Sequence, residues 1–416
     1  MKKNLTLILS GLAILLLAAS CSKENDDEPD LTPKNINLSA AAPVAIQSSN
    51  EFGIELFTKV TESENKNLML SPLSASTALT MLLNGCDGDT YSQLQGTLKY
   101  PYVMTISEIN EAYQSLVGQL LIIDPKVQLA LANAIFYRNG FNVKPPFLAT
   151  MSDDYKATVK GLDFAAPSAL TTINKWASDN TNGKIPEVLS EISGDAVMFL
   201  MNALYFNGDW SYQFDKSLTD ELPFHPDGGS TTDVPTMKGD VGSKVAYGNG
   251  FRAIEIPYGQ TNFTMVVMVP DETLSALYPS FTYQVWDQLT SDLDSRPEFS
   301  KTILTMPKFK FSYEKYLNDQ LMSMGMVDAF SELAADLSGI SDMQIFVSFV
   351  KQNTFIEVDE EGTEAAAVTT IGVYATSGGA PQPFQFIIDK SFIFAIRERT
   401  TNTLLFIGQV INPKEE

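Results

Sequence analysis

The feature that most constrains this chain is a stretch near its C-terminal end, Glu357 to Ser377. After a turn signal at Gly362, Glu364 is the only charged residue as far as Ala375. Alternate positions carry no charge, as the buried face of a period-two strand requires. These positions are Thr363, Ala365, Ala367, Thr369, Ile371 and Val373. The segment suits a sheet interior, yet its alanines and glycine make a poor permanent strand. We predict a strand that forms only under some conditions; a surface loop between two strands is the alternative.

The start of this stretch carries a family resemblance. The residues concerned are Glu360, Glu361, Gly362, Thr363, Glu364, Ala365, Ala366 and Ala367. This octapeptide resembles the proximal hinge of the reactive-centre loop in inhibitory serpins, a family whose loop insertion is a known case of strand addition. The resemblance implies that a protease attacks the loop and forms an acyl-enzyme, and that the freed hinge then inserts into the main sheet.

The same resemblance places the reactive bond. Counting forward from Glu360 with the family's spacing puts the bond between Thr376 and Ser377, with Tyr374 and Ala375 as specificity residues before it. Counting backward from the closing strands puts it nearer Ala380. A small residue at the bond suits an elastase-like pocket, whereas cleavage after Tyr374 would suit a chymotrypsin-like enzyme.

The N-terminus predicts export and tethering. Residues 1–20 combine two lysines, an apolar run and a small-residue exit before Cys21, which is typical of a lipoprotein signal peptide with Cys21 as the lipidated residue. Ordinary signal-peptidase cleavage remains the alternative. Ser22–Glu28 is similar to acidic signals that send lipoproteins to the outer surface, or else is a solvated tail. The predicted organisation is therefore a signal peptide (1–20), an acidic, flexible tether (21–49) and a single domain (50–416), in an outer-membrane lipoprotein exposed at the surface.

Composition excludes several functions. A net charge of −22, with only 28 basic residues, argues against nucleic acid and heparin-like polyanions as partners. With Cys21 assigned to the lipid, Cys86 is expected to be a buried free thiol. The single histidine, His225, lies in a Pro/Gly-rich turn without a nucleophile elbow, and no metal-ligand spacing or phosphate loop is present. We therefore expect no metal, no cofactor and no enzymatic activity. We also expect the chain to be a monomer.

The body of the chain alternates helical and strand-like patterns. We expect helices over 50–60, 73–83 and 321–330, the second capped by Ser71 ahead of Pro72. The apolar runs 127–137 and 196–206 read as buried strands, with core helices as the alternative. Further strands are expected at 254–258, 263–270, 306–311, 384–388, 392–397 and 404–411.

Several motifs extend the resemblance over residues 50–413. It implies the α+β serpin fold: a large central β-sheet, two further sheets, eight to nine helices and a mobile reactive-centre loop. Trp210 would lie at the top of the main sheet, where the loop first enters. A polar cluster beneath the sheet would comprise Asn67, Ser71, Ser74, Asn202 and Gln352. Gln352 stands where the family usually carries histidine, so this position does not titrate near neutral pH.

The leading functional hypothesis is a suicide-substrate inhibitor of serine proteases, of elastase-like or chymotrypsin-like type, that forms a covalent complex. Whether cysteine proteases are also targets is left open. A non-inhibitory carrier or storage protein of the same fold is the alternative, although charged or bulky hinge residues would be expected there. A surface hydrolase or glycan-binding lipoprotein is the third hypothesis, and the sequence offers no catalytic histidine for it.

Overall fold

The computed structural model describes residues 32–296, 299–363 and 384–415. Within these ranges nine α-helices and three short 3₁₀ turns pack around two sheets, in agreement with the expected number of helices. The helices are α1 (Ala42–Thr61), α2 (Pro72–Leu83), α3 (Gly88–Thr97), α4 (Ile106–Leu120), α5 (Pro145–Asp153), α6 (Pro167–Asn180), α7 (Leu274–Leu277), α8 (Tyr283–Asp294) and α9 (Asn318–Ser323). The 3₁₀ turns are Lys216–Leu218, Tyr278–Ser280 and Asp328–Phe330. No helix in the described ranges combines the length and apolar character needed to cross a bilayer.

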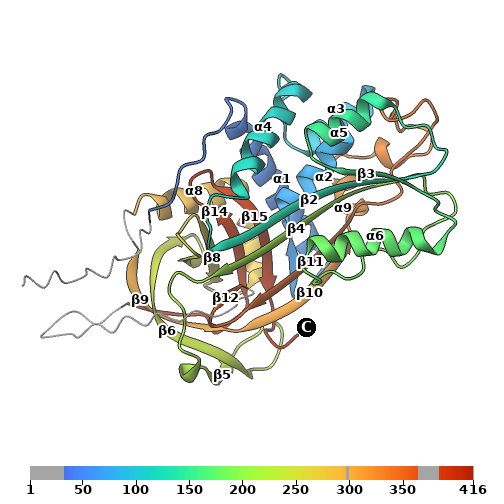
Figure 1. Cartoon of the computed structure of the whole chain (residues 1–416). Helices are drawn as coiled ribbons and strands as arrows, with labels where there is room; N and C mark the ends of the chain where they lie inside the picture. The colour runs from blue at the N-terminus through green and yellow to red at the C-terminus, as the bar shows by residue number, and fades with distance from the viewer. Residues whose placement is uncertain (1–31, 297–298, 364–383, 416) are drawn as a thin grey trace, which may run out of the picture. The chain divides into compact units, whose positions relative to one another are not determined.

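The first sheet has six strands, and every neighbouring pair is antiparallel except β2 with β3. In spatial order these are β10 (Phe309–Tyr316), β11 (Lys351–Val358), β12 (Gly362–Thr363), β4 (Met198–Asp209), β2 (Val127–Arg138) and β3 (Thr158–Leu162). The two apolar runs predicted as buried strands are β2 and β4, paired over their length, so the helical alternative for them is wrong. Figure 1 shows α6 lying beside this sheet, where Ile173 and Trp176 pack against Phe136 of β2.

The second sheet has nine strands and forms the other wall of the core. Its members are β1 (Leu68–Leu70), β15 (Thr403–Val410), β14 (Phe392–Glu398), β8 (Phe263–Pro270), β7 (Phe251–Pro257), β6 (Thr232–Gly248), β9 (Ser300–Pro307), β13 (Phe384–Ile387) and β5 (Asp220–Phe224). The strand β6 pairs with β5 and β9 over its first part and with β7 over its last five residues. The two further sheets that the resemblance implies are therefore the two parts of one sheet, joined through this long strand.

The domain begins earlier than predicted. Helix α1 starts at Ala42, not at residue 50, so the flexible tether proposed for residues 21–49 is wrong for its last eight residues. Ile46, Ser48 and Ser49 are buried. The two serines can be buried because their hydroxyls are hydrogen-bonded within the core. Residues 32–41 are also held, through backbone bonds to the side chains of Asn262, Gln119 and Ser115.

Two other predicted boundaries differ. The helix expected over 321–330 ends at Ser323, because Gly325 adopts φ 114° and breaks the helical path. The strand expected over 306–311 is two strands, β9 and β10, with Lys308 as the single residue between them. The predicted cap is confirmed: Ser71 Oγ accepts the Ser74 N–H at 3.2 Å at the start of α2.

Candidate functional site

The two-residue strand β12 lies between β4 and β11 in the six-stranded sheet, at the C-terminal ends of both strands (Figure 1). Thr363 is in register with Val358 of β11 and with Gly208 of β4, and Gly362 is opposite Asp209. A Cβ atom at Gly362 would lie 2.2 Å from the Gly208 carbonyl oxygen, so only glycine fits there. The predicted hinge thus already occupies the sheet as far as Thr363.

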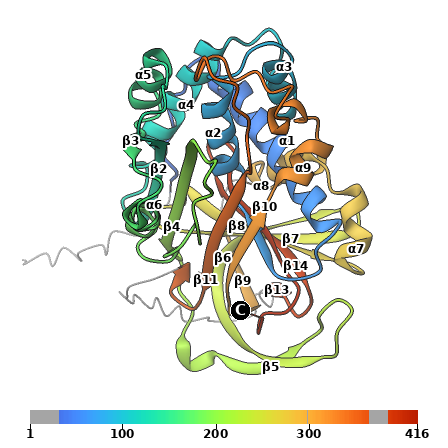
Figure 2. The ribbon, with the colours of Figure 1, turned by 90° about the vertical axis from the view of Figure 1, so that its right-hand side faces the viewer.

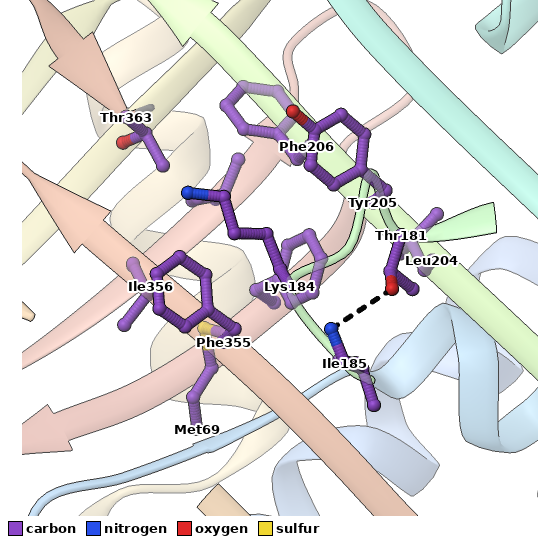
Figure 3. Close-up of a pocket in the computed structure, with 12 residues that line it drawn as sticks. Met69, Thr181, Lys184, Ile185, Leu204, Tyr205, Phe206, Phe355, Ile356 and Thr363 are labelled. Carbon is purple, nitrogen blue, oxygen red and sulfur yellow. Dashed lines mark hydrogen bonds between the residues drawn. The ribbon is translucent and has the colours of Figure 1, made fainter. Parts of the chain in front are cut away.

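From Thr363 toward the N-terminal ends of β4 and β11, the two strands run next to each other, and no ladder in the described residues joins them (Figure 2). A cavity of about 20 Å³ lies along this interval. Figure 3 shows its wall, formed by β4 and β11 side chains, by the turn after α6 and by Thr363. We call this interval between β4 and β11 the slot. It is lined by Met69, Thr181, Lys184, Ile185, Leu204, Tyr205, Phe206, Phe355, Ile356, Thr363, Ile396 and Phe406.

The turn that leads into β12 is held by hydrogen bonds from one segment, residues 210–214. The N–H of Trp210 donates to the Glu361 carbonyl at 2.8 Å, and its indole Nε1 donates to the Asp359 carbonyl at 2.9 Å. The N–H of Phe214 donates to the Glu360 carbonyl at 2.9 Å. These three bonds fix the carbonyl groups of residues 359–361, so the hinge enters the sheet in one register.

A buried aromatic pair supports the hinge from below. Trp210 is 3% exposed and stacks on Tyr258, with ring centroids 4.3 Å apart and planes 11° apart. The Tyr258 hydroxyl, completely buried, is hydrogen-bonded to the Thr363 hydroxyl. Burial raises the pKa of Tyr258 far above its usual value, so the phenol stays neutral. Trp210 therefore lies where it was expected, and Thr363 is the first hinge side chain inside the sheet.

The acidic residues in and beside the hinge have different surroundings. Burial acts to raise the pKa of Glu360, but hydrogen bonds from Lys308 at 2.8 Å and from Thr219 at 2.7 Å outweigh it and leave the pKa below its usual value. Glu361 is paired with Lys216 near the surface. Asp209 has the opposite shift, because burial and then the nearby carboxylate of Glu361 raise its pKa.

The predicted polar cluster is not one cluster. Gln352 Oε1 accepts the Ser71 N–H at 3.0 Å and its Nε2 donates to the Ser71 carbonyl at 2.9 Å, so Gln352, Ser71 and Ser74 do lie together. Asn67 instead binds the backbone of residues 411, 412 and 415 near the C-terminus. Asn202 donates to Asn133 of the neighbouring strand at 2.7 Å, and its buried Oδ1 has no hydrogen-bond partner among the described residues. The five residues therefore fall into three groups.

Other predicted residues lie elsewhere or outside the described ranges. Glu364, Ala365, Ala366 and Ala367 of the hinge, the bond residues Tyr374, Ala375, Thr376 and Ser377, and the lipid candidate Cys21 belong to residues that the structure does not describe. His225 is exposed directly after β5, as expected for a turn histidine. Cys86 is a free, partly buried thiol, and burial raises its pKa to about 12.

Sequence reasoning missed Tyr258, Lys308 and Phe214 as parts of this site. Each comes from a segment far from the hinge in sequence, and none carries a local pattern that links it to residues 359–363. In the described part of the chain, no group of histidine, cysteine, aspartate and glutamate side chains is arranged to hold a metal ion. The arrangement offers a strand start that is already docked, and beyond it no described residue pairs with the facing edges of β4 and β11.

Comparisons with known proteins agree with this geometry. A family model described as "Serpin (serine protease inhibitor)" matches residues 47–413. The chain is 31% identical over 433 residues to an uncharacterized serpin-like protein of Methanosarcina mazei, covering 99% of this chain and 98% of that protein. It is 33% identical to the leukocyte elastase inhibitor of Xenopus laevis, covering 91% and 100%. The crystal structure of the thermophilic serpin tengpin in the native state superimposes with a TM-score of 0.79 at 31% identity, covering 92% of this chain and 96% of that one.

Proposed function

The chain belongs to the serpin family, and we propose that it inhibits serine proteases as a suicide substrate. Serpins are a family of non-enzymatic protease inhibitors, and the fold expected from the sequence is the one that the chain shares with tengpin. The proposal concerns the finer step, namely whether this particular chain traps a protease.

The slot that continues from Thr363 between β4 and β11 is the observation that carries the proposal. Thr363 is paired on both sides, so a strand that continued from it would find one edge of β4 and one edge of β11 in register. Each added ladder hydrogen bond contributes about 0.5–1.5 kcal/mol net. Burial of alanine, isoleucine and valine side chains adds about 25 cal/mol per Å². A native state that keeps the following residues out of the slot is therefore metastable by the sum of these contributions.

The trapping step follows from this driving force. The protease serine oxygen attacks the Thr376 carbonyl, the bond to Ser377 breaks, and Ser377 leaves as a protonated amine while Thr376 remains as the acyl ester. The hinge, freed at its far end, inserts and carries the protease along the sheet. Distortion of the protease oxyanion hole, a device that contributes about 3–4 kcal/mol in such enzymes, then slows hydrolysis of the ester.

The hinge composition favours inhibition over a carrier role. Ala365, Ala366 and Ala367 are small enough to pass between β4 and β11, whereas a bulky or charged series would not enter the slot. Two curated relatives, from Xenopus laevis and Homo sapiens, are named leukocyte elastase inhibitors. The small residues before Ser377 fit an elastase-like pocket, so we propose elastase-like enzymes as the first targets and chymotrypsin-like enzymes as the second.

A panel of serine proteases, with one papain-like cysteine protease, tests the proposal. An inhibitor gives a complex of higher mass that survives denaturation, and a carrier gives clean loop cleavage. Mass spectrometry of the released C-terminal peptide identifies the bond: a start at Ser377 supports the assignment, a start at Ala375 shifts the target class, and a start beyond Ala380 rejects the hinge count. The proposal is contradicted if none of the enzymes in the panel forms a stable complex.

We also propose that the mature chain is a lipoprotein on the outer membrane. The proposal rests on the sequence of residues 1–28, in which Cys21 follows a signal-like segment and precedes an acidic run. Cys21→Ala should release the protein from the membrane fraction, and protease added to intact cells should digest the wild type. Recovery of wild type as soluble periplasmic protein would contradict the anchor.

A further inference from the structure

The slot is wider than the space between two paired strands. The Cα atoms of β4 and β11 lie more than 8 Å apart along most of its length, whereas directly paired strands are about 4.8 Å apart. Two strands that share a neighbour between them are separated by about twice that spacing. Among the described residues, only β12 is such a shared neighbour. Facing strand edges tend to pair with each other, so the width of the slot beyond β12 calls for a contact that maintains it.

The chain between α6 and β4 lies at the border of the slot and is fixed to α6. Ile185 lines the cavity of the slot (Figure 3). Asn174 of α6 holds the residues that follow: its Oδ1 accepts the N–H groups of Val188 and Leu189, both at 3.0 Å, and its Nδ2 donates to the Leu189 carbonyl at 2.7 Å. We call residues 185–189 the strap. Because α6 packs on β2 and β4, the strap belongs to the β4 side of the slot.

Lys351 joins the strap to the other side of the slot. Its Nζ donates to the Val188 carbonyl at 3.0 Å, and its side chain is only 10% exposed. Lys351 is the first residue of β11 and lies on the half-exposed face of that strand, since alternate residues are buried. Its ammonium group also contacts β10, through Glu314 Oε2 at 3.0 Å and the Tyr316 ring, whose centroid is 5.3 Å away. One side chain therefore connects β10 and β11 to the strap.

This connection lies at the far end of the slot from the hinge. Thr363 is opposite both Val358 of β11 and Gly208 of β4. Seven residues back along the two strands are Lys351 and Met201, which at about 3.3 Å per residue places them about 23 Å from β12. If β11 moved against β4 to pair with it directly, the backbone of Lys351 would shift by about one strand spacing of 4.8 Å relative to the strap. The 3.0 Å bond to Val188 could not persist in its present geometry.

We propose that Lys351 is a positioning residue for loop insertion: through the Val188 carbonyl it holds β11 at the distance from β4 that admits one more strand. The inference rests on the proposed inhibitory function. Without this bond, the facing edges of β4 and β11 can pair with each other. The cleaved loop would then have to separate them before it could insert, and insertion would be slower.

The chemistry of the bond sets the size of the effect. A hydrogen bond from a charged donor is stronger than one between neutral groups, and loss of one corresponds to about a tenfold change in a rate. The chain next to the strap keeps another contact with β11, because Lys184 Nζ lies 3.7 Å from Glu357 Oε2. Loss of Lys351 therefore releases β11 at one end of the slot only. Attack by the protease does not involve these residues, so we expect acylation to be unchanged.

Three substitutions test the role of Lys351. Lys351→Met removes the donor to Val188, and Lys351→Arg keeps one. Glu314→Gln is the matched control, because it removes the ion pair of Lys351 with β10 and leaves the bond to the strap. Each protein is nicked in the loop by a protease that it does not trap, and the gain in resistance to denaturant is followed with time. Hydrogen exchange of the β11 amides is measured on the uncleaved proteins.

We expect Lys351→Met to insert about tenfold more slowly than wild type, and Lys351→Arg and Glu314→Gln to insert at close to the wild-type rate. The β11 amides that face the slot should exchange more slowly in uncleaved Lys351→Met, because they then pair with β4. An unchanged or faster rate for Lys351→Met, or equal slowing by Glu314→Gln, would overturn the inference. A nicked wild type that gains no resistance contradicts the proposed function instead, and hydrogen exchange of the uncleaved proteins still decides whether Lys351 sets the width of the slot.

Discussion

Replacing Thr363 by arginine is the sharpest test of hinge insertion. Thr363 is 4% exposed, and its hydroxyl is hydrogen-bonded to Tyr258, which is completely buried. Arginine there would remove the partner of the phenol, which costs about 1–3 kcal/mol, and would bring a charge into the core at several kcal/mol more. At a cost of about 3 kcal/mol or more, the arginine should keep the start of the hinge out of the sheet in the uncleaved protein, so that insertion after cleavage has to bury it. A barrier raised by this amount slows insertion by over a hundredfold, since each 1.36 kcal/mol is a factor of ten.

The assay is the partition between trapping and turnover. An acyl-enzyme either is carried into the sheet or hydrolyses, so a hundredfold slower insertion raises the number of inhibitor molecules consumed per complex by up to about a hundredfold. Thr363→Arg should therefore be cleaved as a plain substrate. Thr363→Ser, which keeps the hydroxyl for Tyr258, is the matched control and should retain trapping. Thr363→Val removes only the hydroxyl and should fall between them.

Folding of the variants must be checked separately, because Thr363 is already in the sheet before cleavage. Denaturant unfolding of the uncleaved proteins provides this check. If Thr363→Arg unfolds cooperatively and still gives an undiminished yield of covalent complex, insertion through this position is refuted.

Three further predictions follow from the site. The pKa of Glu360 is lowered in the folded protein, so the ionised carboxylate stabilises the fold at pH values above the ordinary pKa near 4.5. This stabilisation is lost as the pH falls through the lower folded-state pKa. The free energy of unfolding of Glu360→Gln should lack this pH-dependent loss in acid titrations. The pKa of Asp209 is raised by burial and by Glu361, so its ionised form destabilises the native state at neutral pH, and Asp209→Asn should increase the free energy of unfolding by about 0.5–1 kcal/mol in urea titrations. Gln352→His should leave one backbone group of Ser71 unpaired, lowering the free energy of unfolding by about 1–3 kcal/mol, with a further loss below about pH 6.5 that the wild type does not show.

Much of the framework could be predicted because local patterns encode it. Buried strands such as β2 and β4 are continuous apolar runs bounded by turn residues, and Ser71 ahead of Pro72 is a local helix-start signal. The hinge was recognisable for a similar reason, since alternation and residue size are properties of adjacent positions. The start of α1 was missed because Ser48 and Ser49 look like spacer residues until their buried partners are known.

The surroundings of the hinge could not be predicted in the same way. Lys308 and Tyr258 reach residues 360 and 363 only through the sheet topology, at separations of 52 and 105 residues. A lysine between two strands and a tyrosine at a strand end are each common surface features, so nothing in the sequence marks them. The pKa shifts of Glu360 and Asp209 have opposite signs although both are acids near the same turn, because their neighbours differ in charge.

The division of the predicted polar cluster has a consequence for how the sheet opens. Gln352 of β11 uses its amide on the start of α2, and Asn202 of β4 donates to β2, so each strand is tied to a neighbour on its own side of the slot. Separation of β4 from β11 therefore need not break either amide's bonds. Extending the register of Thr363 along both strands brings Thr369 opposite Gln352 and Asn202. We expect the Thr369 hydroxyl to reach the buried Asn202 Oδ1, which accepts no hydrogen bond from the residues that the structure describes. Gln352 and Asn202, which sequence reasoning grouped together, would then be joined through Thr369 in the inserted form.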